Sequence, residues 1–200
     1  IFVSIYLSAI SLFLWFGILS WFKSGGSPDF AHIYAEARLV QKYPPSEIYD
    51  LDKQASVQKE LFGENLYGGK TMPFVQPPFT LMFLSPLGYL SYMQARLVWL
   101  GLNVFLIAFL PWGLCKWSPY LLRSQRGLVL LSALSFYPFL VCLWQGQISI
   151  LMLWIIVGFL LLLRVRKEFW AGVALGLGLM RFHLIYLVVL LVVSKRRLQV

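Results

Sequence analysis

The chain alternates between long uncharged apolar runs and shorter polar stretches. A helix that spans a membrane needs about 20 consecutive apolar residues, because the hydrocarbon core of a bilayer is about 30 Å thick. Uncharged apolar runs that approach or reach this length cover residues 1–22, 97–115, 127–143 and 148–163. The pattern therefore predicts an all-α integral membrane protein, a polytopic helix bundle in which 1–22 is the first spanning helix.

Basic residues gather in the polar stretches that separate or follow these runs, at 116–126, 164–167 and 195–197. Cytoplasmic loops carry an excess of Lys and Arg, so these three stretches are expected in the cytoplasm. The stretches 23–78 and 144–147 are then expected on the extracytoplasmic side.

Two apolar stretches do not fit a single helix that crosses the membrane once. The stretch 79–90 is short and bounded by prolines, and a full crossing there would place every later basic cluster outside. We therefore expect a re-entrant or interfacial helix on the outer face. The stretch 169–194 is interrupted by Arg181 and His183, although both of its ends are cytoplasmic by charge. Two half-length helices that meet at 181–183 satisfy this pattern, as long as protein or water surrounds the break.

The outer stretch 23–78 is too long for a structureless loop in a compact protein. Apolar residues recur in it at the spacing of one helix face: Phe30, Ile33, Tyr34, Ala37 and Val40. This spacing predicts an amphipathic surface helix that lies on the membrane or on the helix bundle. A second surface helix is expected near 51–62, capped by Asp50 or by Asp52.

Composition narrows the class of protein further. Of the 200 residues, 60% are hydrophobic and only 12% are charged, which argues against a water-soluble fold. The net charge is +9, and residues 79–200 hold eleven basic residues against Glu168 alone. Because this charge lies between apolar runs, membrane topology explains it and no nucleic acid partner is expected. We expect residues 1–200 to be one transmembrane domain from a longer chain, with 97–194 forming the remaining membrane helices.

The candidate catalytic and binding residues are polar residues expected near the outer face of the membrane. Asp29 follows the first span closely and begins a helix, although it would also complement the helix dipole in a purely structural role. Arg96, Arg181 and His183 form a second group. Arginine near the outer leaflet needs a partner, and a lipid phosphate is one that it binds with several donors. Arg96 could instead reach the interface, and His183 could be a packed histidine.

The outer corner at 144–147 offers groups that suit a sugar. Trp144 can stack on a sugar face, while Gln145 and Gln147 offer donors and acceptors to hydroxyls, although a plain helix–helix turn would look the same. Asp29 and His32 lie one helical turn apart, which is weak support for a metal. No metal and no cofactor are expected.

Several features in a shared order resemble a known family. These are Ser27-Pro28-Asp29-Phe30 with Tyr34, Ile48-Tyr49, Phe74 to Pro78, Leu84 to Leu87, Ala95 with Trp99 and Asn103, Gly146-Gln147, and Ala171 to Leu177 before a basic residue. In this order the chain resembles the N-terminal half of glycosyltransferase family 87, membrane mannosyltransferases of the broader GT-C fold. The sequence departs from that family's usual Tyr, Asn and Lys at Gln76, Ser149 and Arg181.

The resemblance implies a multi-pass plasma-membrane protein with its active site on the extracytoplasmic face. It implies transfer of a hexose, with mannose as the expected sugar, from a polyprenyl-phosphate donor to a hydroxyl of a lipid or glycan acceptor. Asp29 would be the catalytic base. The donor phosphate would be bound by Arg181, His183 and Arg96, and the sugar or acceptor by Tyr34, Gln145, Gln147 and Trp144.

A transporter or lipid flippase without transferase activity is the alternative. Such proteins also use broken helices and buried basic residues. They usually need polar residues along a path through the membrane, however, and the spans between 97 and 163 contain few. The sequence therefore favours chemistry at one face of the membrane.

Overall fold

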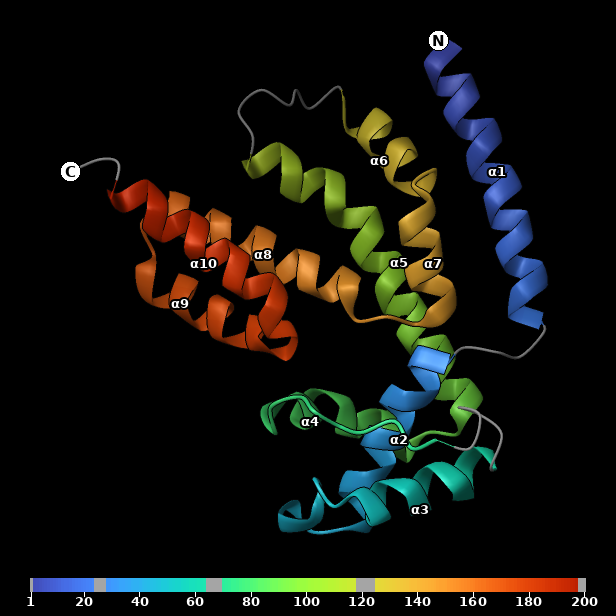
Figure 1. The fold of residues 1–200 in the computed structure, drawn as a ribbon. Helices are drawn as coiled ribbons and strands as arrows, with labels where there is room; N and C mark the ends of the chain where they lie inside the picture. Colours follow the sequence, from blue (N-terminus) through green and yellow to red (C-terminus); the bar gives the residue numbers. More distant parts are fainter. Residues whose placement is uncertain (1, 24–27, 64–69, 118–124, 198–200) are drawn as a thin grey trace.

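The computed structural model describes residues 2–23, 28–63, 70–117 and 125–197, and these residues form helices and no strand, as predicted. The longer helices are α1 (Phe2–Lys23), α2 (Pro28–Lys42), α3 (Leu51–Phe62), α4 (Phe79–Leu84), α5 (Tyr92–Trp117), α6 (Arg126–Leu134), α7 (Tyr137–Gln145), α8 (Ser149–Arg164), α9 (Glu168–Leu177) and α10 (Phe182–Arg197). Short 3₁₀ helices are η1 (Pro45–Glu47), η2 (Ser85–Tyr89) and η4 (Gly178–Arg181). Figure 1 shows α2, α3 and α4 together at one end of α5, with the other long helices around and beyond its other end.

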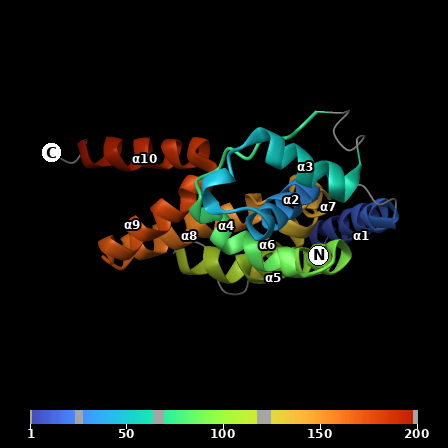
Figure 2. The same ribbon diagram turned by 90° about the horizontal axis from the view of Figure 1, so that it is seen from below.

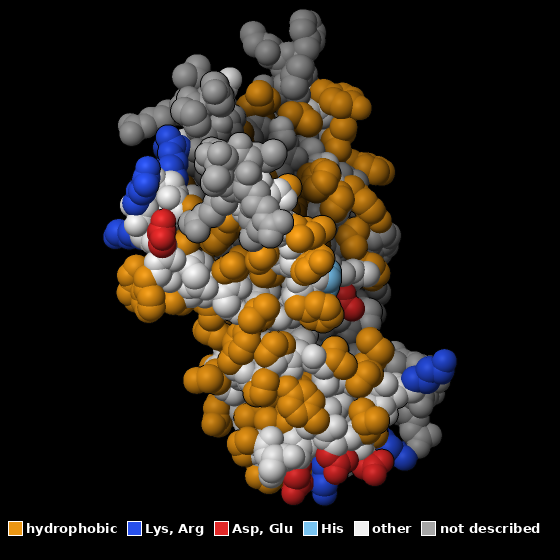
Figure 3. Space-filling model, turned by 60° about the vertical axis from the view of Figure 1, so that its left-hand side comes forward, with side chains coloured by type: hydrophobic (Ala, Val, Ile, Leu, Met, Phe, Trp, Pro, Cys, Tyr) orange, Lys and Arg blue, Asp and Glu red, His pale blue; other side chains and the backbone are white. Residues whose placement is uncertain are grey.

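Several helices are suited to a membrane. By length and composition, Tyr92–Lys116 and Glu168–Val192 are each long and apolar enough to cross one, and α6 with α7 makes a third candidate if the bent pair is one span. One face of the molecule is mostly hydrophobic, with charged side chains gathered towards its two ends (Figure 3). The predicted membrane helices thus exist as helices, while the side of the membrane on which each loop lies stays a prediction.

The predicted span 127–143 is broken rather than continuous. Helices α6 and α7 meet at an angle of 59°. Pro138 explains the break, since it has no N–H to donate to the Leu134 carbonyl and its ring clashes with that carbonyl in a continuous helix. The Ser11 hydroxyl of α1 donates to the Leu134 carbonyl at 3.4 Å, and Ser135 donates to Leu7 of α1 at 2.7 Å. Helix α1 therefore supplies polar partners where the break frees backbone groups.

The chain reverses direction at η4. Helices α9 and α10 extend from η4 towards the same side of the molecule in both ribbon views (Figure 1, Figure 2). A side chain at Gly178 would overlap Ile185 of α10, so glycine permits this close turn. The sequence predicted two half-length helices that meet at 181–183, and α10 begins at Phe182.

Helix α2 is more deeply buried than an amphipathic surface helix would be. Its buried residues lie on all sides of the helix: Phe30, Ala31, Ile33, Tyr34, Ala35, Glu36, Ala37 and Leu39. It packs against α3, α4, η2, α5 and α7. Its approach to η2 is close, because a Cβ at Gly88 would lie 2.6 Å from the Ala37 carbonyl oxygen. Helix α2 thus lies within a hydrophobic core to which α5, α8 and α10 also contribute.

Helix α3 fixes the chain segment that follows it. As predicted it covers Leu51–Phe62, and Asp50 is its cap, accepting from the backbone N–H groups of Asp52 and Lys53. The amide of Gln54 accepts from Phe74 N at 2.8 Å, and the amide of Gln58 both accepts from Met72 N and donates to Met72 O. These bonds hold the segment 70–78 against α3. Residues 24–27, 64–69 and 118–124, which belong to predicted loops, lie outside the described residues.

The stretch 79–90 forms α4 and then the 3₁₀ helix η2, which together make a short apolar helix with Pro86 near the start of its 3₁₀ part. Apolar side chains on it are exposed, including Met82, Phe83 and Tyr89. Exposed apolar groups on a helix of this length suit an interface with lipid, so a re-entrant or interfacial placement stays a prediction.

Candidate active site

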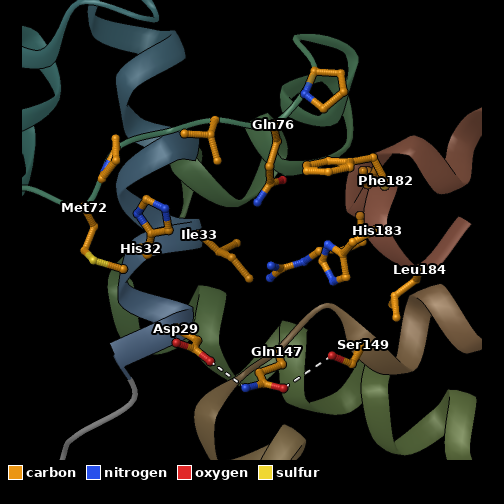
Figure 4. Close-up of a pocket in the computed structure, with 15 residues that line it drawn as sticks. Asp29, His32, Ile33, Met72, Gln76, Gln147, Ser149, Phe182, His183 and Leu184 are labelled. Atoms are coloured by element: carbon orange, nitrogen blue, oxygen red, sulfur yellow. Dashed lines mark hydrogen bonds between the residues drawn. The ribbon is translucent and has the colours of Figure 1, made fainter. Parts of the chain in front are cut away.

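A cavity of about 530 Å³ lies where four parts of the chain meet. Helix α2 forms one wall, the segment 70–78 a second, the corner after α7 a third, and η4 with the start of α10 a fourth (Figure 4). Polar side chains that line it are Asp29, His32, Gln76, Gln147, Ser149, Arg181 and His183. Its size suits a small-molecule ligand, for which cavities of roughly 300–1,000 Å³ are usual.

Asp29 lies in the first turn of α2 and is held by Gln147. The Nε2 group of Gln147 donates to Oδ2 of Asp29 at 2.8 Å (Figure 4). The same nitrogen donates to Gln145 Oε1 at 2.5 Å, while Gln147 Oε1 accepts from the Ser149 hydroxyl at 3.3 Å. An amide has two N–H donors, so Asp29 and Gln145 together use both. The orientation of the Asp29 carboxyl is therefore fixed from the corner after α7.

Gly146 makes this corner possible. Its φ of 73° is left-handed, which is a usual end for a helix and favours glycine. A Cβ there would lie 2.5 Å from Phe30 Cβ of α2, so the corner and α2 approach too closely for any larger residue. The indole of Trp99 in α5 donates to the Gly146 carbonyl at 2.8 Å. Helices α2 and α5 thus locate Gln147 beside Asp29.

Arg181 and His183 supply positive or hydrogen-bonding groups on the opposite wall. Both line the cavity, at the junction of η4 and α10. This junction is also the N-terminus of a 16-residue helix, and the dipole of a helix favours an anion at that end. A guanidinium binds phosphate oxygens with several donors in a fixed plane. The wall therefore has the chemistry of an anion site facing the Asp29 wall.

The structure brings four of the predicted site residues into this arrangement. Asp29, Arg181, His183 and Gln147 line the cavity, and Gln145 joins them through its hydrogen bond to Gln147. This cluster combines a carboxylate with cationic and amide groups from segments far apart in the chain.

Three other predicted residues are placed elsewhere. Tyr34 is buried in the core and donates its hydroxyl to the Leu90 carbonyl at 2.8 Å. Arg96 is 3% exposed in α5, and Trp144 is part of α7; neither lines the cavity. Tyr34 therefore has a core position. None of the three residues lines the cavity, so their predicted binding roles have no contact there to support them.

His32 and Glu36 belong to the site region, although sequence reasoning did not identify Glu36. His32 lines the cavity, and its Nε2 lies 3.0 Å from Oε1 of the buried Glu36. Burial lowers the pKa of His32, the Asp29 carboxylate raises it, and Arg181 lowers it. Burial also raises the pKa of Glu36 to about 8, against the opposing charge of Arg181. The spacing of Asp29, His32 and Glu36 at i, i+3 and i+7 on one helix face was the available signal.

No group of three His, Cys, Asp or Glu side chains in the described ranges is close enough together to hold a metal ion. Among the described residues, the cavity instead combines one carboxylate, one arginine, two histidines and neutral amides. Such a set can accept a proton from a hydroxyl on one wall and bind an anionic group on the other.

Comparison with known proteins identifies a family. A family model described as Glycosyltransferase family 87 matches residues 74–199. This match contains the corner after α7 and the η4–α10 wall, whereas Asp29 and the rest of α2 precede it. No curated protein and no solved structure matches the chain.

Proposed function

The chain belongs to glycosyltransferase family 87, and from this membership we propose that it moves a hexose, with mannose as the first candidate, from a polyprenyl-phosphate donor to an acceptor hydroxyl. Membership itself makes the protein a membrane glycosyltransferase, which uses a sugar donor and an acceptor. The proposal adds the class of donor, the sugar, and a lipid or glycan as the acceptor.

The observation that carries the proposal is the cavity with Asp29 on one wall and Arg181 and His183 on another. A transferase that uses a lipid-phosphate sugar needs a base for the attacking hydroxyl and positive charge for the leaving phosphate. The hydrogen bond from Gln147 to Asp29 supports the first role, because it holds the carboxyl in one orientation. The start of α10 supports the second role, because its N–H groups add to the side-chain donors.

The reaction would proceed by displacement at the anomeric carbon. Asp29 takes the proton of the acceptor hydroxyl as its oxygen forms a bond to the anomeric carbon. The bond from that carbon to the phosphate oxygen breaks, and the polyprenyl phosphate departs with the electron pair. General base catalysis of this kind contributes about 10²–10⁴-fold. Arg181 and His183 would stabilise the charge that develops on the phosphate.

A lipid donor also fits the apolar part of the cavity wall. Val75 and Phe182 line the cavity and yet are 75% and 67% exposed, so apolar surface continues from the cavity to the outside of the protein. A polyprenyl chain can lie on such a surface while its phosphate reaches Arg181. Since Lys and Arg gather in the stretches assigned to the cytoplasm, this site would face the outside of the plasma membrane.

The test is Asp29→Asn in the full-length protein, reconstituted with labelled polyprenyl-phosphate mannose and an acceptor extract. We expect sugar transfer and release of free polyprenyl phosphate to fall about 10²–10⁴-fold, because the amide cannot accept the proton. Asp52→Asn is the matched control, since this exposed residue lies in α3, does not line the cavity and should leave transfer unchanged. Near-normal transfer by Asp29→Asn would exclude the base role. A transporter or flippase would release no free polyprenyl phosphate in any variant.

A further inference from the structure

Glu36 is a buried acid that accepts no hydrogen bond from its described neighbours on α3. Its exposed fraction is 3%, and Gln54 and Gln58 of α3 lie beside it around a small void. Both amides donate elsewhere, from Gln54 to the Ile48 carbonyl and from Gln58 to the Met72 carbonyl. In the part of the chain that the structure describes, no N–H or O–H group donates to either carboxyl oxygen. An ionised carboxylate in this position would be costly.

The acid form of Glu36 has a partner. His32 Nε2 lies 3.0 Å from Glu36 Oε1, and the unprotonated nitrogen of a neutral imidazole can accept a hydrogen bond from the O–H of a carboxylic acid. His32 in turn lines the cavity one turn after Asp29. The pair thus connects the buried side of α2 to the cavity wall.

Burial favours the neutral forms of both residues, and the nearby charges oppose it only in part. Burial raises the pKa of Glu36 and lowers the pKa of His32, and Arg181 and Asp29 are the charged groups that act on the pair. Five elements of the described chain pack against α2. Helix α3 presents its two glutamines to the pair, and α4, η2 and α7 carry no charged residue. Helix α5 carries Arg96, which is not among the charged groups that shift either pKa.

We propose that Glu36 is a positioning residue that works in its acid form: its O–H donates a hydrogen bond to Nε2 of His32, holds the neutral imidazole in place at the cavity wall, and preserves the positive charge of the cavity for an anionic lipid phosphate. This inference rests on the proposed function. Loss of the proton adds a buried negative charge whose field reaches Arg181, so binding of a phosphate donor weakens. A proton on Glu36 is therefore part of the donor site, although Glu36 touches no substrate.

The kinetic test compares donor KM on both sides of pH 8 in the full-length protein. In the wild type, KM should rise on the order of 10-fold above that pH, as expected for one added charge felt through the protein interior. Glu36→Gln keeps a neutral donor towards His32, so its KM should match the wild type below pH 8 and stay flat above it. Glu60→Gln, an exposed acid paired with Lys42, should keep the alkaline rise. A Glu36→Gln variant that keeps this rise, or that binds the donor poorly below pH 8, overturns the proposal.

A spectroscopic test does not depend on sugar transfer. Infrared spectra of the purified protein at neutral pH should contain the C=O absorption of a protonated carboxyl group. This absorption should disappear in Glu36→Gln and persist in Glu60→Gln. If neither the wild type nor any variant transfers sugar from the polyprenyl donor, the proposed function is wrong. The spectra still show whether Glu36 is protonated. A spectrum unchanged by Glu36→Gln shows that the acid is ionised and overturns the inference.

Discussion

The Nε2 group of Gln147 donates to Oδ2 of Asp29 at 2.8 Å and so joins two residues that are 118 positions apart. One lies at the start of α2 and the other at the corner between α7 and α8. The bond fixes the carboxyl from a part of the chain that is distant in sequence. Its loss should therefore disturb the site without disturbing α2.

Replacing Gln147 tests this bond. Gln147→Leu should lower the rate constant for transfer by about 10-fold, the value of one hydrogen bond, with a smaller effect on donor KM. Gln147→Glu should lower it further, since a second carboxylate beside Asp29 repels it. Steady-state transfer assays measure both, with the exposed Gln125→Leu as the control. Wild-type turnover in Gln147→Leu would contradict a role for the bond in catalysis.

Replacing Arg181 tests the opposite wall. Arg181→Gln should raise donor KM by about 10-fold or more, because hydrogen bonds to charged groups are stronger than neutral ones. Arg181→Lys should recover part of this loss, since it restores the charge but not the planar set of donors. The exposed Arg166→Gln is the control, since this arginine follows α8 and does not line the cavity. Equal donor KM in all three variants would remove Arg181 from the donor site.

Gly146→Ala tests the corner itself. The left-handed φ and the close approach to Phe30 should destabilise the protein by about 1–3 kcal/mol and lower transfer through displacement of Gln147. Gly172→Ala is the matched control, because no atom lies within 4 Å of the added Cβ. Alanine inside a helix is favoured by up to about 1 kcal/mol, so this control should be neutral or stabilising. Thermal unfolding in detergent compares the two, and equal stability would contradict the tight corner.

The stability of the fold should depend on pH through Glu36. Its folded-state pKa of about 8 lies above the ordinary value of 4.5, so the proton that it holds stabilises the fold fully below pH 4.5. This contribution is lost as pH rises through the window to about 8. Glu36→Gln removes the dependence and should raise the free energy of unfolding at neutral pH by about 3 kcal/mol at most. Denaturation at both ends of the window measures it, and a gain only at the acidic end would contradict the sign.

The sequence predicted the helices that depend on local signals. Helix α3 has the predicted ends because Asp50 caps it and Gly63, with a φ of 74°, ends it. The break between α6 and α7 was missed, although Pro138 was visible, because the apolar run continues through it and length alone indicated one span. The burial of α2 was also missed. Its pattern showed one apolar face, whereas contacts with η2 and α3 cover the others.

The site was predictable in its residue types and not in its geometry. Asp29, Arg181 and His183 were candidates because polar side chains near the membrane are energetically costly and usually have a function there. Which of them meet depends on packing between distant segments, and the same packing leaves Tyr34 in the core. Glu36 was not identified from the sequence because its proposed role depends on its burial. The burial of a single acidic residue is visible only in the folded chain.

The attachment of the 70–78 segment to α3 decides how the cavity responds to its surroundings. Gln54 and Gln58 hold that segment through side-chain amides, which have no net charge and do not titrate at ordinary pH. Changes in salt concentration or in pH are therefore not expected to displace the wall of the cavity that the 70–78 segment forms. A response of the enzyme to the pH of its surroundings would arise from the electrostatic field within the cavity, while this wall keeps its position.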